Sequence, residues 1–235
     1  MRVRLGFAAT CLVIAVSCAS AAAAQDKPQL TFNVGAASDY VFRGISLSKE
    51  RGQIFAGADA TYKEIYGGVW TSNANFAPFG DKGTNQEIDV YGGWRPQVGG
   101  ANLDLGVVYY GYLNQPGGGI PKADYWEAYA KASVPVGPLT LGAAFYYSPE
   151  YSLGAGKAGY YEGNAAYTKD KWSVSGAVGR QEVETGIDYT TWNLGVGYAI
   201  TPKIGLDVRY WDTDANTPTL DEDDPRVVAS IKVTF

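Results

Sequence analysis

The chain has 235 residues, of which 24 are acidic, 19 are basic and none is histidine, and its net charge is −5. An acidic balance without any basic cluster excludes nucleic acid as the expected partner and argues against docking on anionic headgroups. The lack of histidine excludes Ser-His and Asp-His catalytic sites. Because the only cysteines are Cys11 and Cys18, zinc and haem sites are not expected in the rest of the chain. We therefore predict a protein that is not an enzyme and has no cofactor and no metal site.

The first 24 residues predict a cleavable signal peptide. Arg2 and Arg4 form a basic start, residues 5–17 form an apolar core too short to span a membrane, and alanines at 22–24 form a small-residue cleavage site. A lipoprotein signal at Cys18 is the alternative, but Ala15 is a poor residue three positions before such a cysteine. We expect export, cleavage after Ala24, and one domain over residues 25–235, which no linker divides.

The remaining residues alternate apolar with polar at a period of two, without helical spacing, which predicts strands and almost no helix. We expect twelve strands of the length that crosses a bilayer at a tilt. Their apolar faces lie within residues 30–36, 54–62, 66–70, 88–94, 103–109, 126–134, 139–145, 161–167, 172–178, 192–198, 204–210 and 227–235. In the third and weakest of them, we assign Tyr66, Gly68 and Trp70 to the apolar face.

Short and long connections alternate between these strands, as they do in outer-membrane barrels. The sequence therefore predicts an all-β, transmembrane, antiparallel up-and-down β-barrel of about twelve strands. The even number places both termini in the periplasm. The predicted location is the bacterial outer membrane, with its lipid and lipopolysaccharide as partners.

The apolar face is expected to point outward, into lipid. A twelve-stranded barrel is wider than the eight-stranded kind that side chains just fill, and Ala, Gly and Val would leave an apolar interior empty. The aromatic residues also gather at strand ends, as interfacial girdles do. One predicted belt holds Phe32, Tyr62, Tyr66, Trp94, Tyr167, Trp172, Tyr198 and Phe235, and the opposite belt holds Tyr40, Phe42, Tyr109, Trp126, Phe145, Tyr161, Trp192 and Tyr210.

The other face then lines the lumen and carries the candidate functional residues. The acidic set is Asp39, Asp59, Glu87, Asp89, Asp104, Glu127, Glu162 and Asp207, and the basic set is Arg43, Arg95, Lys131, Arg209 and Lys232. The uncharged residues between them are Asn33, Tyr91, Tyr129, Asn164 and Asn193. Charges beside a low-dielectric wall must be paired or hydrated. A hydrated lumen would be a narrow pore for small polar solutes or ions, with a weak cation preference from the acidic excess. Interlocked charges would instead give a closed structural or ligand-binding barrel. We favour the pore.

Three other functions are weaker alternatives. Glu87 and Asp89 share a face, so a carboxylate-pair glycosidase is conceivable, but a pair of lumen charges is the simpler account. The acidic loop at 212–224 offers carboxylates for Ca²⁺ or Mg²⁺, yet its spacing matches no dedicated calcium loop. The weaker form of this hypothesis is that divalent cations bridge the loop weakly to lipopolysaccharide phosphates. An adhesin would need longer loops than these.

Residues 38–46, SDYVFRGIS, resemble the N-terminal signature of the TorF family of outer-membrane porins, also called the Gcw_chp family. Residues 66–73, YGGVWTSN, and 87–93, EIDVYGG, resemble its next two blocks. The resemblance implies a porin-like barrel and makes Asp39 and Arg43 a shared charged pair, which we expect to form a salt bridge near the first external loop. This pair would either lie at the pore mouth or only pin the loop. Phe235 resembles the C-terminal signal by which the barrel-assembly machinery recognises its substrates.

Overall fold

A computed structural model describes residues 27–117, 121–215 and 221–235. The predicted signal peptide, residues 1–24, lies outside the described residues. Within them, no helix is long and apolar enough to cross a membrane. The two short helices, η1 (Ala77–Phe79) and η2 (Ser152–Gly154), have three residues each.

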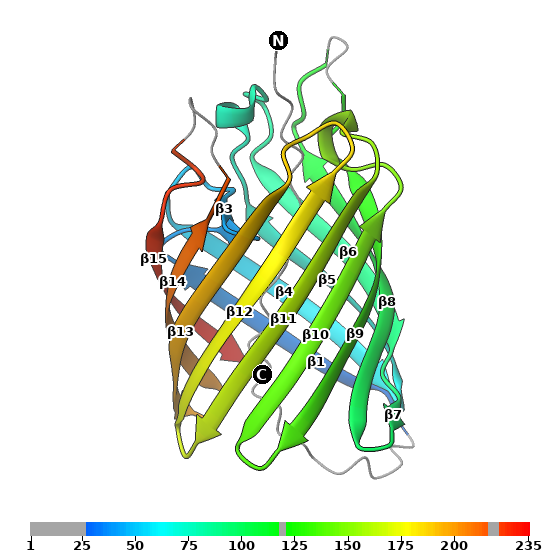
Figure 1. The fold of residues 1–235 in the computed structure, drawn as a ribbon, viewed down its shortest axis with the longest axis vertical. Helices are drawn as coiled ribbons and strands as arrows, with labels where there is room; N and C mark the ends of the chain where they lie inside the picture. The colour runs from blue at the N-terminus through cyan, green and yellow to red at the C-terminus, as the bar shows by residue number, and fades with distance from the viewer. Residues whose placement is uncertain (1–26, 118–120, 216–220) are drawn as a thin grey trace.

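Twelve long antiparallel strands form a closed barrel (Figure 1), as the sequence predicts. They are β1 (Gln29–Ala37), β4 (Gln53–Tyr62), β5 (Ile65–Asn73), β6 (Gln86–Trp94), β8 (Ala101–Leu113), β9 (Tyr125–Val136), β10 (Leu139–Ser148), β11 (Ala158–Lys169), β12 (Trp172–Val183), β13 (Tyr189–Thr201), β14 (Ile204–Thr213) and β15 (Arg226–Thr234). Each pairs with the next along the chain, and β15 closes the barrel by pairing with β1, with Val233 opposite Val34. A closed sheet leaves no unpaired edge, which a membrane requires.

The two ends of the barrel differ in the length of their connections. At one end, here called the turn end, the strands are joined at residues 63–64, 95–100, 137–138, 170–171 and 202–203. A short strand, β7 (Gln97–Val98), lies in the longest of these and pairs with β8. At the other end, the loop end, the connections are residues 38–52, 74–85, 114–124, 149–157, 184–188 and 214–225. The predicted alternation of short and long connections is therefore confirmed, except that the connection at 184–188 is one residue shorter than the turn at 95–100.

The outer surface of the barrel is apolar along its whole circumference. In β1, Leu30, Phe32 and Val34 are exposed, and the same alternation runs through the other strands to Val227 and Ile231 in β15. An exposed apolar area that encircles a protein is far larger than the patches that soluble monomers tolerate. The outward direction of the apolar face is thus as predicted.

The predicted face of the third strand, β5, is wrong. Tyr66 and Trp70 point inward, with exposed fractions of 5% and 8%, whereas Ile65 and Val69 point outward, with 64% and 48%. A shift of one residue moves every side chain of a strand to the opposite face. In β5 both alternating sets of side chains include large apolar residues, and each set is interrupted by a glycine. The alternation therefore does not decide which set points outward.

Apart from Tyr66, Tyr40 and Phe42, the residues of the predicted aromatic belts lie on the outer face of the barrel. Trp172 and Tyr198 pack together outside one end of the barrel, with ring centroids 4.6 Å apart, and Phe145 and Tyr161 do so towards the other end, at 5.0 Å. Tyr40 and Phe42 are buried inside the barrel, so their assignment to a belt is wrong.

Candidate functional site: the barrel interior

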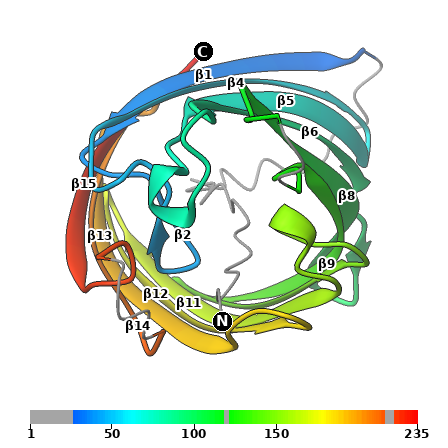
Figure 2. The same ribbon diagram turned by 90° about the horizontal axis from the view of Figure 1, so that it is seen from above.

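The first long loop folds into the barrel instead of projecting from it. Within this loop, β2 (Val41–Phe42) and β3 (Ile45–Ser46) form a hairpin, and residues 42–48 are all buried. Figure 2 shows β2 inside the ring of barrel strands. We call residues 39–48 the inserted hairpin. Its apolar side chains Phe42, Ile45 and Leu47 are almost fully buried, so their burial stabilises the inward position.

A two-residue turn places the tip of the inserted hairpin. Arg43 and Gly44 both have positive φ angles, 46° and 87°, as a type I′ turn requires. At Gly44 an added Cβ would also overlap the hydroxyl oxygen of Thr191 on the barrel wall. Only glycine therefore satisfies both the backbone conformation and the close approach to the wall.

Arg43 at this tip is held by the opposite wall of the barrel. Its Nη1 and Nη2 donate hydrogen bonds to both oxygens of Glu127 on β9, at 3.0 and 2.8 Å, and Nη1 also donates to Gln181 on β12, at 2.8 Å. The guanidinium carbon lies 4.2 Å from the ring centroid of Tyr160 and 5.0 Å from that of Tyr146. Both charged side chains are 1% exposed, so each depends on the other for compensation of its lost hydration.

The expected salt bridge between Asp39 and Arg43 is wrong. Asp39 remains at the base of the inserted hairpin, where it accepts hydrogen bonds from Ser46 and Ser48, both at 2.7 Å, and pairs with Arg226 at 3.0 Å. The hairpin carries Arg43 away from this base towards β9. Asp39 and Arg43 therefore have different partners, although both are buried.

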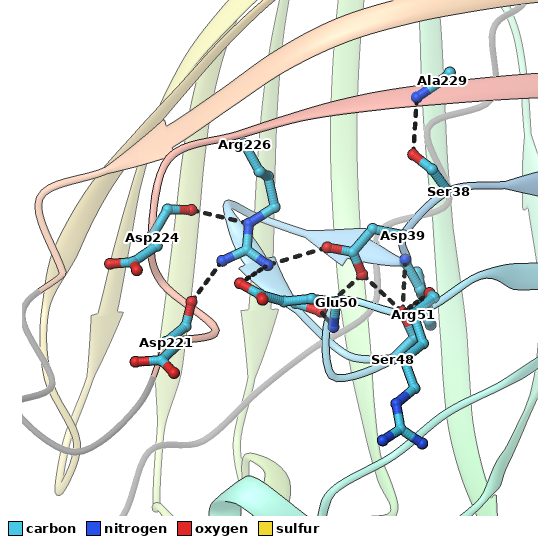
Figure 3. Close-up of polar contacts among 11 residues, drawn as sticks. Ser38, Asp39, Ser48, Glu50, Arg51, Asp221, Asp224, Arg226 and Ala229 are labelled. Atoms are coloured by element: carbon cyan, nitrogen blue, oxygen red, sulfur yellow. Dashed lines mark hydrogen bonds and ion pairs between the residues drawn. The ribbon is translucent and has the colours of Figure 1, made fainter.

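Arg226 joins the base of the inserted hairpin to the last long loop (Figure 3). Besides Asp39, it pairs with Glu50 at 3.3 Å and donates hydrogen bonds to the backbone carbonyls of Asp221 and Asp224. The predicted acidic loop thus packs partly against the hairpin, and its residues 216–220 lie outside the described residues. Burial raises the pKa of the neighbouring Glu222 carboxyl, and the charges of Asp221 and Glu50 raise it further.

Tyrosines and a phenylalanine pack around the inserted hairpin in the half of the barrel nearest the loop end. The rings of Tyr110 and Tyr125 lie 4.6 Å apart, those of Phe76 and Tyr112 4.7 Å, and those of Tyr125 and Tyr151 4.9 Å. Two predicted lumen carboxylates, Glu87 and Glu127, are buried in this packed half. Glu87 accepts a hydrogen bond from Tyr40 at 3.0 Å, and Glu127 accepts one from Tyr110 at 3.2 Å.

An open cavity of about 420 Å³ lies inside the barrel, beside the inserted hairpin and along the strands from β14 through β1 to β10. Eight of the thirteen predicted lumen residues line it, namely Asp39, Asp59, Asp89, Arg95, Lys131, Asp207, Arg209 and Lys232. Four are acidic and four are basic, so the acidic excess on which the weak cation preference was based is absent from the cavity lining. That these residues line a conducting pore stays a prediction.

The five other predicted residues are not part of that lining. Arg43, Glu87 and Glu127 lie in the packed half. Asp104 accepts hydrogen bonds from Tyr66 and Arg95 at the turn end, and Glu162 accepts them from Tyr160 and Asn164. By contrast, Asp207 and Arg209 on β14 do line the cavity, and they form a buried ion pair at 3.1 Å.

Arg226 and most of the aromatic lining of the interior were missed by the sequence reasoning, which assigned only Tyr91 and Tyr129 to the lumen. The inward aromatic residues include Tyr66, Trp70, Tyr110, Tyr112, Tyr125, Tyr146 and Tyr160. A signal for three of them is present in the sequence, because Tyr109-Tyr110, Tyr146-Tyr147 and Tyr160-Tyr161 are adjacent pairs. Neighbouring residues of a strand point to opposite faces, so each pair must place one ring inside the barrel.

Basic and aromatic side chains alternate at the turn end of the cavity. The guanidinium of Arg95 lies 3.6 Å from the ring centroid of Tyr66, and the ammonium of Lys131 lies 4.4 Å from that of Tyr129. The hydroxyl of Tyr66 donates to Asp104 at 2.6 Å and also bonds to the hydroxyl of Tyr129. We call Arg95, Lys131, Asp104, Tyr66 and Tyr129 the basic-aromatic cluster.

Solved structures with a similar fold are outer-membrane proteins. The KdgM porin matches with a TM-score of 0.60 over 87% of this chain and 99% of that one, at 9% identity. An outer-membrane channel from Pseudomonas putida F1 matches with a TM-score of 0.53 over 88% of this chain and 95% of that one, at 10% identity. At such identities the likeness is one of fold. Comparison with curated proteins found no matching sequence.

The family comparison covers nearly the whole chain. Residues 21–235 match the model of the Gcw_chp family, which is described as a bacterial protein of unknown function. The match includes the inserted hairpin, the cavity lining and the strand that closes the barrel. The chain belongs to the Gcw_chp family.

Proposed function

We propose that the protein is an outer-membrane channel through which small polar solutes or ions diffuse passively. The observation that carries this proposal is the cavity of about 420 Å³, lined by four acidic and four basic side chains, inside a barrel with an apolar outer surface. Charged groups in such an interior must be hydrated or paired. A hydrated, charged lumen within a lipid-facing barrel is what a diffusion pore needs. The fold shared with outer-membrane channels supports the same function.

The inserted hairpin is the constriction of this channel. It lies across the interior near the loop end, and the buried aromatic residues pack around it. The cavity extends from there along strands on both sides of the barrel, from β14 through β1 to β10. A solute would therefore pass beside the hairpin, and the size of the remaining path would limit which solutes can cross.

The surroundings follow from the same proposal. The leader would direct export, both termini would face the periplasm, and the loop end would face outward among lipopolysaccharide. Phe235 stacks beside Phe32, with ring centroids 6.4 Å apart, and their backbones are hydrogen-bonded at the seam between β1 and β15. This exposed terminal aromatic is suited to recognition by the assembly machinery before the barrel closes.

A closed barrel is the second candidate, and the packed half of the interior favours it. If the inserted hairpin and the tyrosines leave no continuous path, the protein would be a structural or ligand-binding barrel with a salt-bridged lumen. The buried pairs Arg43–Glu127 and Asp207–Arg209 are compatible with that role.

Single-channel recording in planar bilayers distinguishes the two candidates. The refolded protein without its leader is compared with a variant in which residues 40–47 are replaced by a short Gly-Ser link. A channel gives unitary current in the wild type and a larger one in the variant. Current in the variant alone indicates a barrel closed by the hairpin. Absence of current in both overturns the channel, provided that both proteins show the heat-modifiable gel mobility of folded barrels.

A further inference from the structure

We propose that the basic-aromatic cluster binds the carboxylate group of small organic anions, through Arg95 and Lys131. This proposal deepens the proposed channel function, because it names the class of solute that the lumen favours. Transport of the anion rests on the channel function, whereas binding of the anion can be measured without it. Both basic residues line the cavity, so a solute in the cavity reaches them.

The charges of the cluster do not cancel. Arg95 and Lys131 contribute two positive charges, and Asp104 contributes one negative charge. Asp104 contacts Arg95 at 3.3 Å, whereas Lys131 forms no ion pair within the part of the chain that the structure describes. The ammonium of Lys131 instead lies over two rings, 4.4 Å from the centroid of Tyr129 and 5.2 Å from that of Tyr146. A partly buried ammonium in this position is a strong donor for an anion.

Arg95 provides the second donor. Its Nε contacts Asp104, its guanidinium plane stacks on Tyr66 at 3.6 Å, and its side chain is 52% exposed. Among the described residues, no hydrogen bond uses its Nη groups. The planar guanidinium matches the geometry of a carboxylate and can bind both of its oxygens. Stacking on Tyr66 fixes the plane before a solute arrives.

The rest of the cluster is already satisfied and holds these two donors in place. Asp104 accepts from Tyr66 at 2.6 Å, and the hydroxyls of Tyr66 and Tyr129 bond to each other. Asp59 on β4, the strand next to β5, accepts a hydrogen bond from Tyr91 at 2.7 Å. Lys232 also lines this cavity.

Two carboxylates lie at the level of Lys131, namely Asp104 opposite it on β8 and Glu162 on β11, beyond β10. Asp104 already accepts from Tyr66 and Arg95, and Glu162 from Tyr160 and Asn164. Neither forms an ion pair with Lys131 among the described residues.

The size of the cavity limits the solute. About 420 Å³ lies at the lower end of the range for small-molecule sites, so the anion is a small molecule such as a dicarboxylate of a few carbons. We use succinate as the probe.

Calorimetric titration of succinate into the full barrel in detergent tests the site. The variants are Lys131→Met and Arg95→Gln, and the matched control is Lys203→Met, which removes the same charge from an exposed turn at the same end. A charge-assisted hydrogen bond contributes enough that each lumen variant should weaken succinate binding by about tenfold or more, while the control stays within about twofold. No measurable succinate binding by the wild type, or equal binding by Lys131→Met, overturns the proposal.

Reversal potentials in a potassium chloride gradient distinguish a failure of the anion site from a failure of the proposed channel function. The site predicts a shift towards cation preference in Lys131→Met and none in Lys203→Met. If no current flows but succinate binding is lost in Lys131→Met, the anion site stands and the channel falls. If current flows and neither succinate binding nor the reversal potential depends on Lys131, the channel stands and the anion site falls.

Discussion

Replacing Arg43 by methionine should destabilise the barrel strongly, because it leaves the Glu127 carboxylate buried without its cation. The change removes three hydrogen bonds, two to Glu127 and one to Gln181, at a site where both charged side chains are 1% exposed. Breaking a buried pair by removal of one partner costs about 3–5 kcal/mol. Tyr110 still donates to Glu127 at 3.2 Å, so we expect the lower part of that range.

The double variant Arg43→Met, Glu127→Met tests the physical reason. Replacing both members of a buried pair by apolar residues of similar volume is often close to neutral. The double variant should therefore recover about 2 kcal/mol or more of the unfolding free energy that Arg43→Met loses. Such a coupling energy lies in the upper part of the range for residues in contact. Urea unfolding of the refolded barrel in detergent, followed by tryptophan fluorescence, gives the unfolding free energy of both variants. The comparison holds if the slope of that free energy with urea concentration is the same in all the proteins.

Two results would refute this reasoning. If Arg43→Met unfolds within about 0.5 kcal/mol of the wild type, which is the usual range for surface changes, the hairpin tip is not held in the barrel. If the double variant is less stable than either single variant, the cost does not arise from an uncompensated charge.

Three further predictions concern the hairpin and the barrel wall. Gly44→Ala should lower the unfolding free energy by about 1–3 kcal/mol, because Gly44 has a φ of 87° and no space for a Cβ; a urea midpoint equal to that of the wild type would argue against the turn. Arg226→Gln should raise single-channel conductance by releasing the base of the hairpin, whereas Arg180→Gln, which breaks an exposed pair at 3.8 Å, should leave it unchanged; equal conductance in all three proteins contradicts this role. Val69→Arg should cost about 2–4 kcal/mol in lipid vesicles, and a neutral effect there would restore the face that the sequence predicts for β5.

The barrel wall could be predicted from the sequence because its pattern is local. Eleven of the twelve strands alternate clearly enough that the apolar phase identifies the lipid face, and the structure places those residues outside. β5 is the exception, because its glycines interrupt the alternation and both of its phases carry large apolar residues. A local pattern predicts which side chains of a strand point outward only where one of the two alternating sets is clearly more apolar than the other.

The interior could be predicted only in part. The inward phase identified the charged residues, but the pairing of Arg43 with Glu127 joins positions 84 residues apart and that of Asp39 with Arg226 joins positions 187 apart. Neither has a local signal. The inserted hairpin was also hidden, because an apolar segment with aromatic residues next to a strand resembles a continuation of the wall.

Cysteine accessibility at two adjacent residues of β15 tests the central claim, that water fills the interior and lipid covers the outside. Residues 25–235 contain no cysteine, since both cysteines lie at positions 11 and 18. Ser230 lines the cavity, and the neighbouring Ile231 is exposed on the outer face. In planar bilayers, a charged thiol reagent that cannot cross lipid should react with Ser230→Cys and reduce its current in steps, and should leave Ile231→Cys unchanged. Modification of Ile231→Cys alone, or no reaction at Ser230→Cys, would contradict a hydrated channel inside this barrel.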